Sequence, residues 1–127
     1  MESRMGELLE YSRFINLKTK SFETKEVDGQ DLELLHYAFG IAGEAGELVD
    51  AVKKYFFYNQ ELDIENVEEE LGDLLFYIQA MVNVLGLNLL DVIENNKEKL
   101  ENRYPTGYSD SLAKKRLDKN ASSKTKR

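Results

Sequence analysis

The sequence predicts an all-α protein, built as a helical bundle of four to five helices. Apolar residues recur at spacings of three and four positions, which is the period of an α-helix and not that of a strand. Pro105 is the only proline among the 127 residues, so little interrupts the helical segments. A hydrophobic content of 42% is enough for one compact domain with its own core.

We predict a first helix at about residues 2–18. Its apolar residues share one face and are Met5, Leu8, Leu9 and Ile15. The polar stretch 19–30 contains glycine and is typical of a loop. A second helix is expected from near Asp31 to Phe57. Two adjacent apolar stripes run along it, which predicts burial over much of its circumference.

The third helix should run from about Ile64 to Leu85, because Asp63 just before it can act as an N-cap. Gly86 ends this helix, and Asn88 can cap a fourth one. The fourth helix should stop where three residues that disfavour its continuation follow, namely Tyr104, Pro105 and Gly107.

Composition excludes several classes of site and partner. No cysteine is present, so disulfides and thiolate metal sites are impossible. A formal net charge of −7 argues against binding to a nucleic-acid polymer. No stretch approaches the roughly 18 apolar residues that cross a membrane, and no signal peptide is recognisable. We expect a cytoplasmic protein, with residues 1–110 as its domain and 111–127 as a basic tail of low order.

Two pairs of acidic residues border the buried stripes of the second and third helices. Glu44 and Glu47 form one pair, and Glu70 and Asp73 form the other. The members of each pair are three positions apart and therefore share a helix face. Antiparallel packing would bring the four carboxylates together, where they repel one another unless protons or cations neutralise them. Hard oxygen ligands favour Mg²⁺ or Mn²⁺ over Zn²⁺.

Other interpretations of the same residues stay open at this point. The acids could be solvated charges of an ordinary helical protein, because such pairs are common. A di-iron carboxylate bundle also places acids on facing helices, but it needs two Glu-x-x-His motifs. His36 is the only histidine and forms one such motif with Glu33, which disfavours the di-iron site. We expect His36 to be a hydrogen-bonded core or interface residue.

The order Glu-x-x-Glu, variable gap, Glu-x-x-Asp resembles the signature of the MazG-like all-α nucleoside triphosphate pyrophosphohydrolases. The strings LLHYAFGIAGEAGELVDAVKKYFFY and NVEEELGDLLFYI carry this signature, and NKEKLENRYPTGY is similar to a third block of the family. The resemblance covers about residues 32–108. The chain departs from it at residues 58–60, where many relatives have a His-Gly-Lys-like turn, so no phosphate contact is assigned there.

The resemblance implies Mg²⁺-dependent hydrolysis of (deoxy)nucleoside triphosphates to monophosphate and pyrophosphate, for control of the nucleotide pool. It implies a homodimer or homotetramer. It also assigns both catalysis and metal binding to the same four acids, which are Glu44, Glu47, Glu70 and Asp73. The alternatives are a non-catalytic helical interaction module, or the same chemistry on dUTP or a phosphoribosyl nucleotide.

Four further residues are candidates for binding the substrate phosphates. Lys54 lies two helical turns beyond Glu47, close to the same face. The others have i, i+3 and i+7 spacing on the fourth helix and are Asn96, Lys99 and Arg103. For Lys54 the alternative is a favourable charge near a helix C-terminus, and for Arg103 it is a structural ion pair.

Overall fold

The computed structural model describes residues 3–22 and 26–122, which form helices and no strand, as the sequence predicts. Six helices are present in these residues because the chain after the fourth helix adds two short ones. They are α1 (Arg4–Lys18), α2 (Gly29–Phe57), α3 (Ile64–Val84), α4 (Leu89–Arg103), α5 (Asp110–Lys115) and α6 (Leu117–Ser122).

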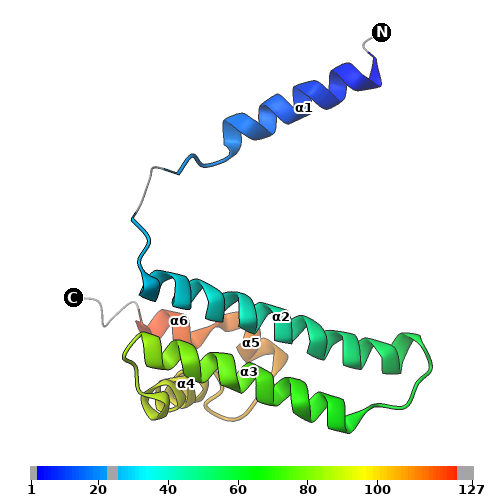
Figure 1. Cartoon of the computed structure of the whole chain (residues 1–127). Helices are drawn as coiled ribbons and strands as arrows, with labels where there is room; N and C mark the ends of the chain where they lie inside the picture. Colours follow the sequence, from blue (N-terminus) through cyan, green and yellow to red (C-terminus); the bar gives the residue numbers. More distant parts are fainter. Residues whose placement is uncertain (1–2, 23–25, 123–127) are drawn as a thin grey trace.

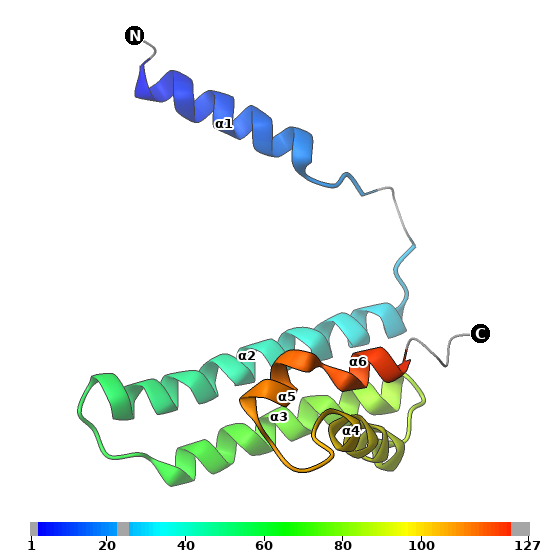
Figure 2. The same cartoon turned by 180° about the vertical axis from the view of Figure 1, so that it is seen from behind.

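The centre of the molecule is the antiparallel pair α2 and α3, which lie side by side along most of their length (Figures 1 and 2). The connection 58–63 joins them, and the predicted cap is confirmed, since Asp63 accepts a hydrogen bond from the Asn66 N–H at 3.0 Å. At the other end, the Gln30 side chain donates to the Val84 carbonyl at 2.8 Å. This pair of helices is the frame on which the acidic residues are placed.

The start of α2 is set by a capping box that the sequence analysis did not identify. Asp28 accepts a hydrogen bond from the Asp31 N–H at 2.8 Å, and the Asp31 carboxylate accepts one from the Asp28 N–H at 3.4 Å. These two bonds satisfy backbone donors that the first turn of a helix leaves without partners. The helix therefore begins slightly earlier than the expected start near Asp31.

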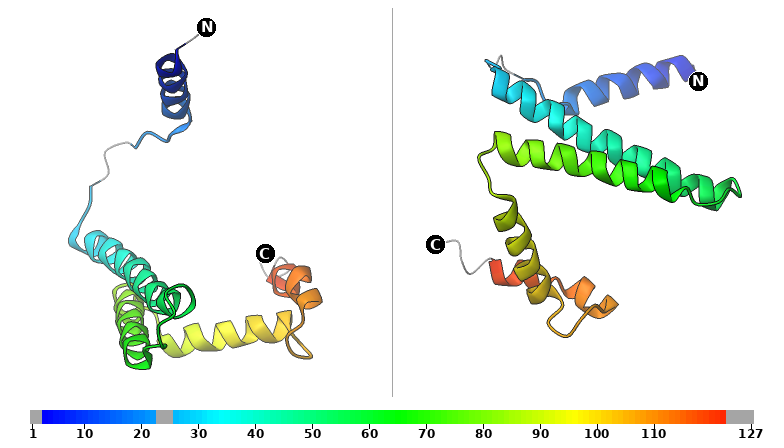
Figure 3. Two further views of the ribbon diagram at one scale, coloured as in Figure 1. Left: turned by 90° about the vertical axis from the view of Figure 1, so that its right-hand side faces the viewer. Right: turned by 60° about the horizontal axis from the view of Figure 1, so that its bottom comes forward.

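The chain turns sharply between α3 and α4. Gly86 adopts a left-handed backbone with φ +66°, and Asn88 caps α4 by accepting from the Leu90 N–H at 2.8 Å, so both predictions are confirmed. The axes of α3 and α4 differ by 107°, and α4 points away from the α2–α3 pair (Figure 3). Among the described residues no single helix is long and apolar enough to span a membrane, and α3 and α4 meet that criterion only when joined across this bend.

The basic tail holds more secondary structure than expected. Residues 110–122 form α5 and α6, which pack against α4. Asp118 of α6 is almost fully buried, because it is paired with Arg103 of α4. Residues 123–127 lie outside the described part, and the division of the chain at residue 110 stays a prediction.

A single copy of the chain buries little of its apolar surface. No residue of α1 is buried, and this helix lies apart from the others in Figures 1 and 2. The expectation that α2 is buried over much of its circumference is wrong for the isolated chain, where Leu35, Phe39 and Val49 are 50%, 68% and 65% exposed. The reason is that α3 covers one side of α2 only.

Candidate functional site

Three of the four predicted acids converge between α2 and α3. Glu44 of α2 and the pair Glu70 and Asp73 of α3 each offer a carboxylate oxygen, and these oxygens all lie within 4.8 Å of one another. Glu44 and Glu70 are half-buried, whereas Asp73 is exposed. Antiparallel packing of the two helices brings the pairs together, as their spacing in the sequence predicts.

The fourth acid, Glu47, lies at the edge of this group. It follows Glu44 by almost one helical turn and is exposed, and it is not one of the three convergent residues. Its negative charge nevertheless acts on the cluster, because it helps to raise the pKa of Glu70. Glu47 therefore belongs to the electrostatic environment of the three acids.

The electrostatics of the cluster centre on Glu70. Partial burial raises the pKa of its carboxyl above the ordinary value of 4.5, and a hydrogen bond with Glu44 raises it further. The charges of Glu44, Glu47 and Asp73 act in the same direction. Each of these causes disfavours the ionised form of Glu70. A cation among the carboxylates would remove the repulsion.

The donor set and its spacing fit a hard divalent cation. All three groups offer oxygen, which Mg²⁺ and Mn²⁺ prefer. Oxygens bound at about 2.1 Å to an octahedral Mg²⁺ lie about 3 Å apart when adjacent and about 4 Å apart when opposite. Separations of up to 4.8 Å approach these values, so small rotations of the side chains would complete the site. Asp73, being exposed, leaves the cluster open to solvent and to a substrate.

An aromatic contact lies next to the acids. Gly40 precedes Glu44 by about one turn, and the Tyr77 ring on α3 occupies the space where a Cβ of Gly40 would lie. The His36 ring meets the Tyr77 ring edge-on, with centroids 5.9 Å apart. His36 is exposed, its ring is tilted against that of Tyr37, and it does not belong to the acidic cluster. The expected core position of His36 is wrong, because its side chain is exposed in the single chain, whereas the alternative of an interface role stays a prediction.

The structure places Lys54 in an ion pair on its own helix. Its ammonium group lies 2.9 Å from the Asp50 carboxylate, and both side chains are about half exposed. A hydrogen bond with Asp50 raises the pKa of Lys54, and the charge of Glu47 adds to this effect. The position agrees with the alternative of a favourable charge near the helix C-terminus. A role in binding phosphate stays a prediction.

The predicted basic row on α4 does not lie beside the acids within one chain. Asn96 and Lys99 are exposed on a helix that points away from the α2–α3 pair (Figure 3). Arg103 instead makes a two-pronged ion pair with Asp118, with nitrogen–oxygen distances of 2.8 and 2.9 Å. This geometry agrees with the structural ion pair that we held as the alternative for Arg103.

Asp118 is the structural residue that sequence reasoning missed. Its carboxylate is only 2% exposed, and the Arg116 guanidinium also approaches it, at 3.6 Å. The hydrogen bond from Arg103 holds the pKa of Asp118 well below its ordinary value of 3.8. No motif indicates this pairing, because Asp118 lies among basic residues in a segment expected to be poorly ordered.

Two comparisons with known proteins found a match to this chain. Residues 33–108 match the family model of the MazG nucleotide pyrophosphohydrolase domain. The chain is also 34% identical over 86 residues to the Gene 37 protein of Mycobacterium phage L5, a match that covers 63% of this chain and 75% of that protein. No solved structure matches. The region matched by the family model contains the acidic cluster and the row on α4, and it leaves out α1, α5 and α6.

Proposed function

Because the chain belongs to the MazG nucleotide pyrophosphohydrolase family, we propose that it hydrolyses (deoxy)nucleoside triphosphates to nucleoside monophosphate and pyrophosphate with Mg²⁺. The family match over residues 33–108 confirms the resemblance seen in the sequence. The observation that carries the proposal is the convergence of the Glu44, Glu70 and Asp73 carboxylates within 4.8 Å. Cytoplasmic control of the nucleotide pool is the role that we propose for this activity.

The first task of the acids in this proposal is to hold the metal ion. Glu44, Glu70 and Asp73 would hold the cation, with Glu47 adding negative charge at the rim. When bound, Mg²⁺ (or Mn²⁺) would neutralise charge on both the carboxylates and the substrate phosphates. The like charges of Glu44, Glu47 and Asp73 help to raise the pKa of Glu70, and such a cation would offset them.

The chemistry requires a positioned water and a proton acceptor. The water oxygen forms a bond to a phosphorus atom of the α–β phosphate bridge, and a P–O bond of that bridge breaks. One proton of the water passes to a carboxylate, and the departing phosphate oxygen takes the electron pair of the broken bond. The acceptor would be one of the carboxylates of this site, Glu44, Glu47, Glu70 or Asp73.

The acidic cluster offers no group that attracts the negatively charged phosphates, so their binding would use polar and basic residues elsewhere. Asn96, Lys99 and Arg103 remain our predicted phosphate-binding residues on α4, and Lys54 remains one on α2. The helix that carries the first three residues, α4, runs away from the α2–α3 pair of its own chain (Figure 3). We therefore propose that these three residues act at the site of a neighbouring subunit, within a homodimer or homotetramer.

Phosphorus NMR of the reaction products tests the proposed bond cleavage. The protein would be incubated with Mg²⁺ and a panel of ribo- and deoxynucleoside triphosphates that includes dUTP. Monophosphate and pyrophosphate should appear together from the start of the reaction. Initial formation of diphosphate and inorganic phosphate would contradict the assigned cleavage. No turnover of any nucleotide in the panel would reject the proposed activity and favour a helical interaction module.

A further inference from the structure

We propose that the face of α2 opposite α3 is an interface with a second copy of this chain, paired antiparallel about Ala42. The family resemblance implies an assembly but assigns it to no surface. The inference rests on exposure, charge and side-chain size along one helix, and it does not depend on the proposed hydrolysis.

An apolar stripe runs along the side of α2 that faces away from α3. We call it the outer stripe, and it consists of Leu35, Ala38, Ala42, Val49, Val52 and Phe56. At 3.6 residues per turn these positions fall within an arc of about 100°. Glu44 and the buried Ala51 lie on the other side of the helix, towards α3. Val49 is 65% exposed and Phe56 is 71% exposed, so the chain itself leaves this stripe uncovered.

The accessible surface of the chain is far larger than a monomer of its size needs. It amounts to 11,360 Å². A folded monomer of 14.7 kDa is expected to expose about 6,900 Å². The excess of about 4,500 Å² per chain is ample for a permanent dimer, in which the two partners together bury about 2,000–5,000 Å². Part of this excess belongs to α1, none of whose residues is buried, so the area is sufficient for a dimer but does not by itself locate the interface.

Charges at the two ends of the stripe identify that partner as another copy. Asp31 precedes Ala42 by eleven positions and Lys53 follows it by eleven, and both lie on the same side of α2 as the stripe. Antiparallel pairing about Ala42 therefore sets Asp31 of each copy opposite Lys53 of the other. This arrangement is the self-complementary pattern that a two-fold interface requires.

Side-chain size along the stripe suits the same pairing. Ala38 and Ala42 at its middle let two helices approach closely. Leu35 precedes Ala42 by seven positions and Val49 follows it by seven. Leu35 of each copy would therefore meet Val49 of the other copy across the two-fold axis. The larger apolar side chains would thus cover one another at the two ends of the contact.

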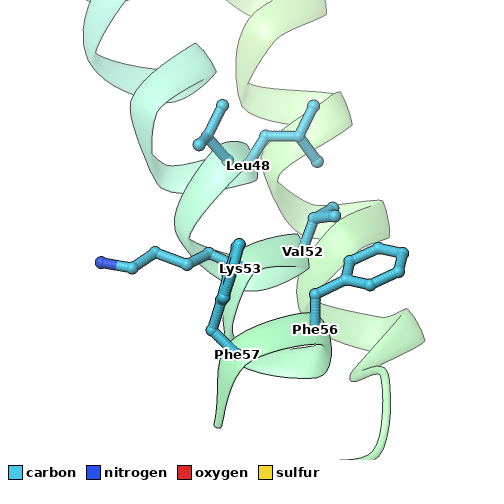
Figure 4. Close-up of a pocket in the computed structure, with 6 residues that line it drawn as sticks. Leu48, Val52, Lys53, Phe56 and Phe57 are labelled. Atoms are coloured by element: carbon cyan, nitrogen blue, oxygen red, sulfur yellow. The ribbon is translucent and has the colours of Figure 1, made fainter.

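Two shallow grooves mark these ends. One has a volume of about 400 Å³ on the C-terminal half of α2, where the stem of Lys53 lies beside Val52, Phe56 and Phe57 (Figure 4). The other, of about 340 Å³, lies at the N-terminal half and is lined by Val27, Asp31, Leu34, Leu35 and Ala38. Antiparallel pairing brings the N-terminal groove of each copy against the C-terminal groove of the other.

Disulfide cross-linking at the two-fold axis tests this register. The chain contains no cysteine, so Ala42→Cys introduces a single thiol. In the proposed dimer the two thiols face each other at a contact where small residues allow the Cα separation of about 4.4–6.8 Å that a disulfide needs. Mild oxidation should therefore yield a covalent dimer rapidly. Glu65→Cys, at an exposed position of α3, is the matched control and should cross-link at least about tenfold more slowly. Equal rates would overturn the proposal.

Sedimentation provides the second measurement, which does not require oxidation. The wild type should be a dimer or a larger even-numbered assembly at micromolar concentration. Val49→Asp should weaken the association at least about tenfold, because it would place two uncompensated charges in an apolar contact. Helicity should not change, since Val49 is 65% exposed in the single chain. Leu75→Asp changes a residue that is 63% exposed on α3 and should leave the mass unaltered.

Three outcomes of sedimentation would overturn the proposal. They are a monomeric wild type, a Val49→Asp variant of unchanged mass, and association that appears only after α1 is removed. The last would mean that α1 of the same chain covers the outer stripe. Both measurements can be made without nucleotide, so their failure is distinguishable from a failure to find hydrolysis.

Discussion

The ring of Tyr77 packs against Gly40 at the point where α2 and α3 approach, in space that a Cβ at position 40 would fill. Gly40 lies about one turn before Glu44, and Tyr77 lies one turn after Asp73. The contact therefore fixes the separation of the two helices next to the acidic cluster. A side chain at position 40 would force the ring, the helices or both to move.

Gly40→Ala should lower the thermal midpoint and weaken hydrolysis. Overpacking of this kind costs about 1–3 kcal/mol, which exceeds the gain of up to about 1 kcal/mol from replacing a helical glycine by alanine. Gly43→Ala is the matched control, because nothing lies within 4 Å of its added Cβ. The control should be neutral or slightly stabilising. Equal thermal midpoints for the two variants would show that the Tyr77 contact does not constrain the helices.

Arg103→Ala should destabilise the packing of α6 on α4. It leaves the Asp118 carboxylate, only 2% exposed, without its two-pronged partner, and a buried charge that loses its partner is costly. Arg116→Ala removes only the longer, 3.6 Å contact to the same carboxylate and should have a much smaller effect. Amide hydrogen exchange across residues 110–122 would measure both. An unchanged exchange rate with a reduced kcat/KM would instead assign Arg103 to phosphate binding.

The same ion pair predicts the direction of acid sensitivity. The pKa of Asp118 is held below its ordinary value of 3.8, chiefly by the hydrogen bond from Arg103. A carboxyl whose pKa is lower in the folded state than in the unfolded state stabilises the folded protein at pH values above its unfolded-state pKa. For Asp118 that contribution is lost as the pH falls below 3.8 towards the folded-state pKa. Thermal midpoints measured from pH 5 down to pH 2 should fall less steeply in Arg103→Ala than in the wild type. Identical slopes would rule out a contribution from this pair.

Lys99→Ala separates substrate binding from stability. Lys99 is exposed on α4, so its removal should leave the thermal midpoint nearly unchanged. Loss of a charge-assisted hydrogen bond to phosphate costs about 1.5–3 kcal/mol, which corresponds to a fall of about 10- to 100-fold in kcat/KM. Lys97→Ala is a suitable control, because Lys97 pairs with Glu94 at 3.3 Å on the same helix. An equal loss of activity in both variants would remove Lys99 from the predicted row.

Local signals in the sequence were sufficient to place the main helices. Asp63, Gly86 and Asn88 act through contacts within a few residues, so their effects follow from position alone. The convergence of Glu44 with Glu70 and Asp73 also follows once two helices of known periodicity are packed antiparallel. What these predictions share is that each depends on one helix or one helical hairpin.

Features that depend on distant packing were not predictable in the same way. Asp118 meets Arg103 across fifteen positions because α6 folds back on α4, and nothing in the local pattern indicates that return. The apolar stripes of α2 were recognised, but periodicity does not distinguish a face covered by the same chain from one left for a partner. Leu35 and Val49 belong to these stripes and are exposed in the single chain.

The Mg²⁺ response of Glu70→Gln tests the carboxylate site most directly. Mg²⁺ should raise the thermal midpoint of the wild type, since binding to the folded state alone contributes about 2.7 kcal/mol at a hundred times Kd. Without metal, Glu70→Gln should be neutral or stabilising, because it removes a charge from the convergent acids. It should also lose most of the Mg²⁺ shift and nearly all hydrolysis, whereas Glu69→Gln, an exposed neighbour, should keep both. A Glu70→Gln variant with a wild-type Mg²⁺ shift and normal turnover would show that Glu70 does not hold the metal.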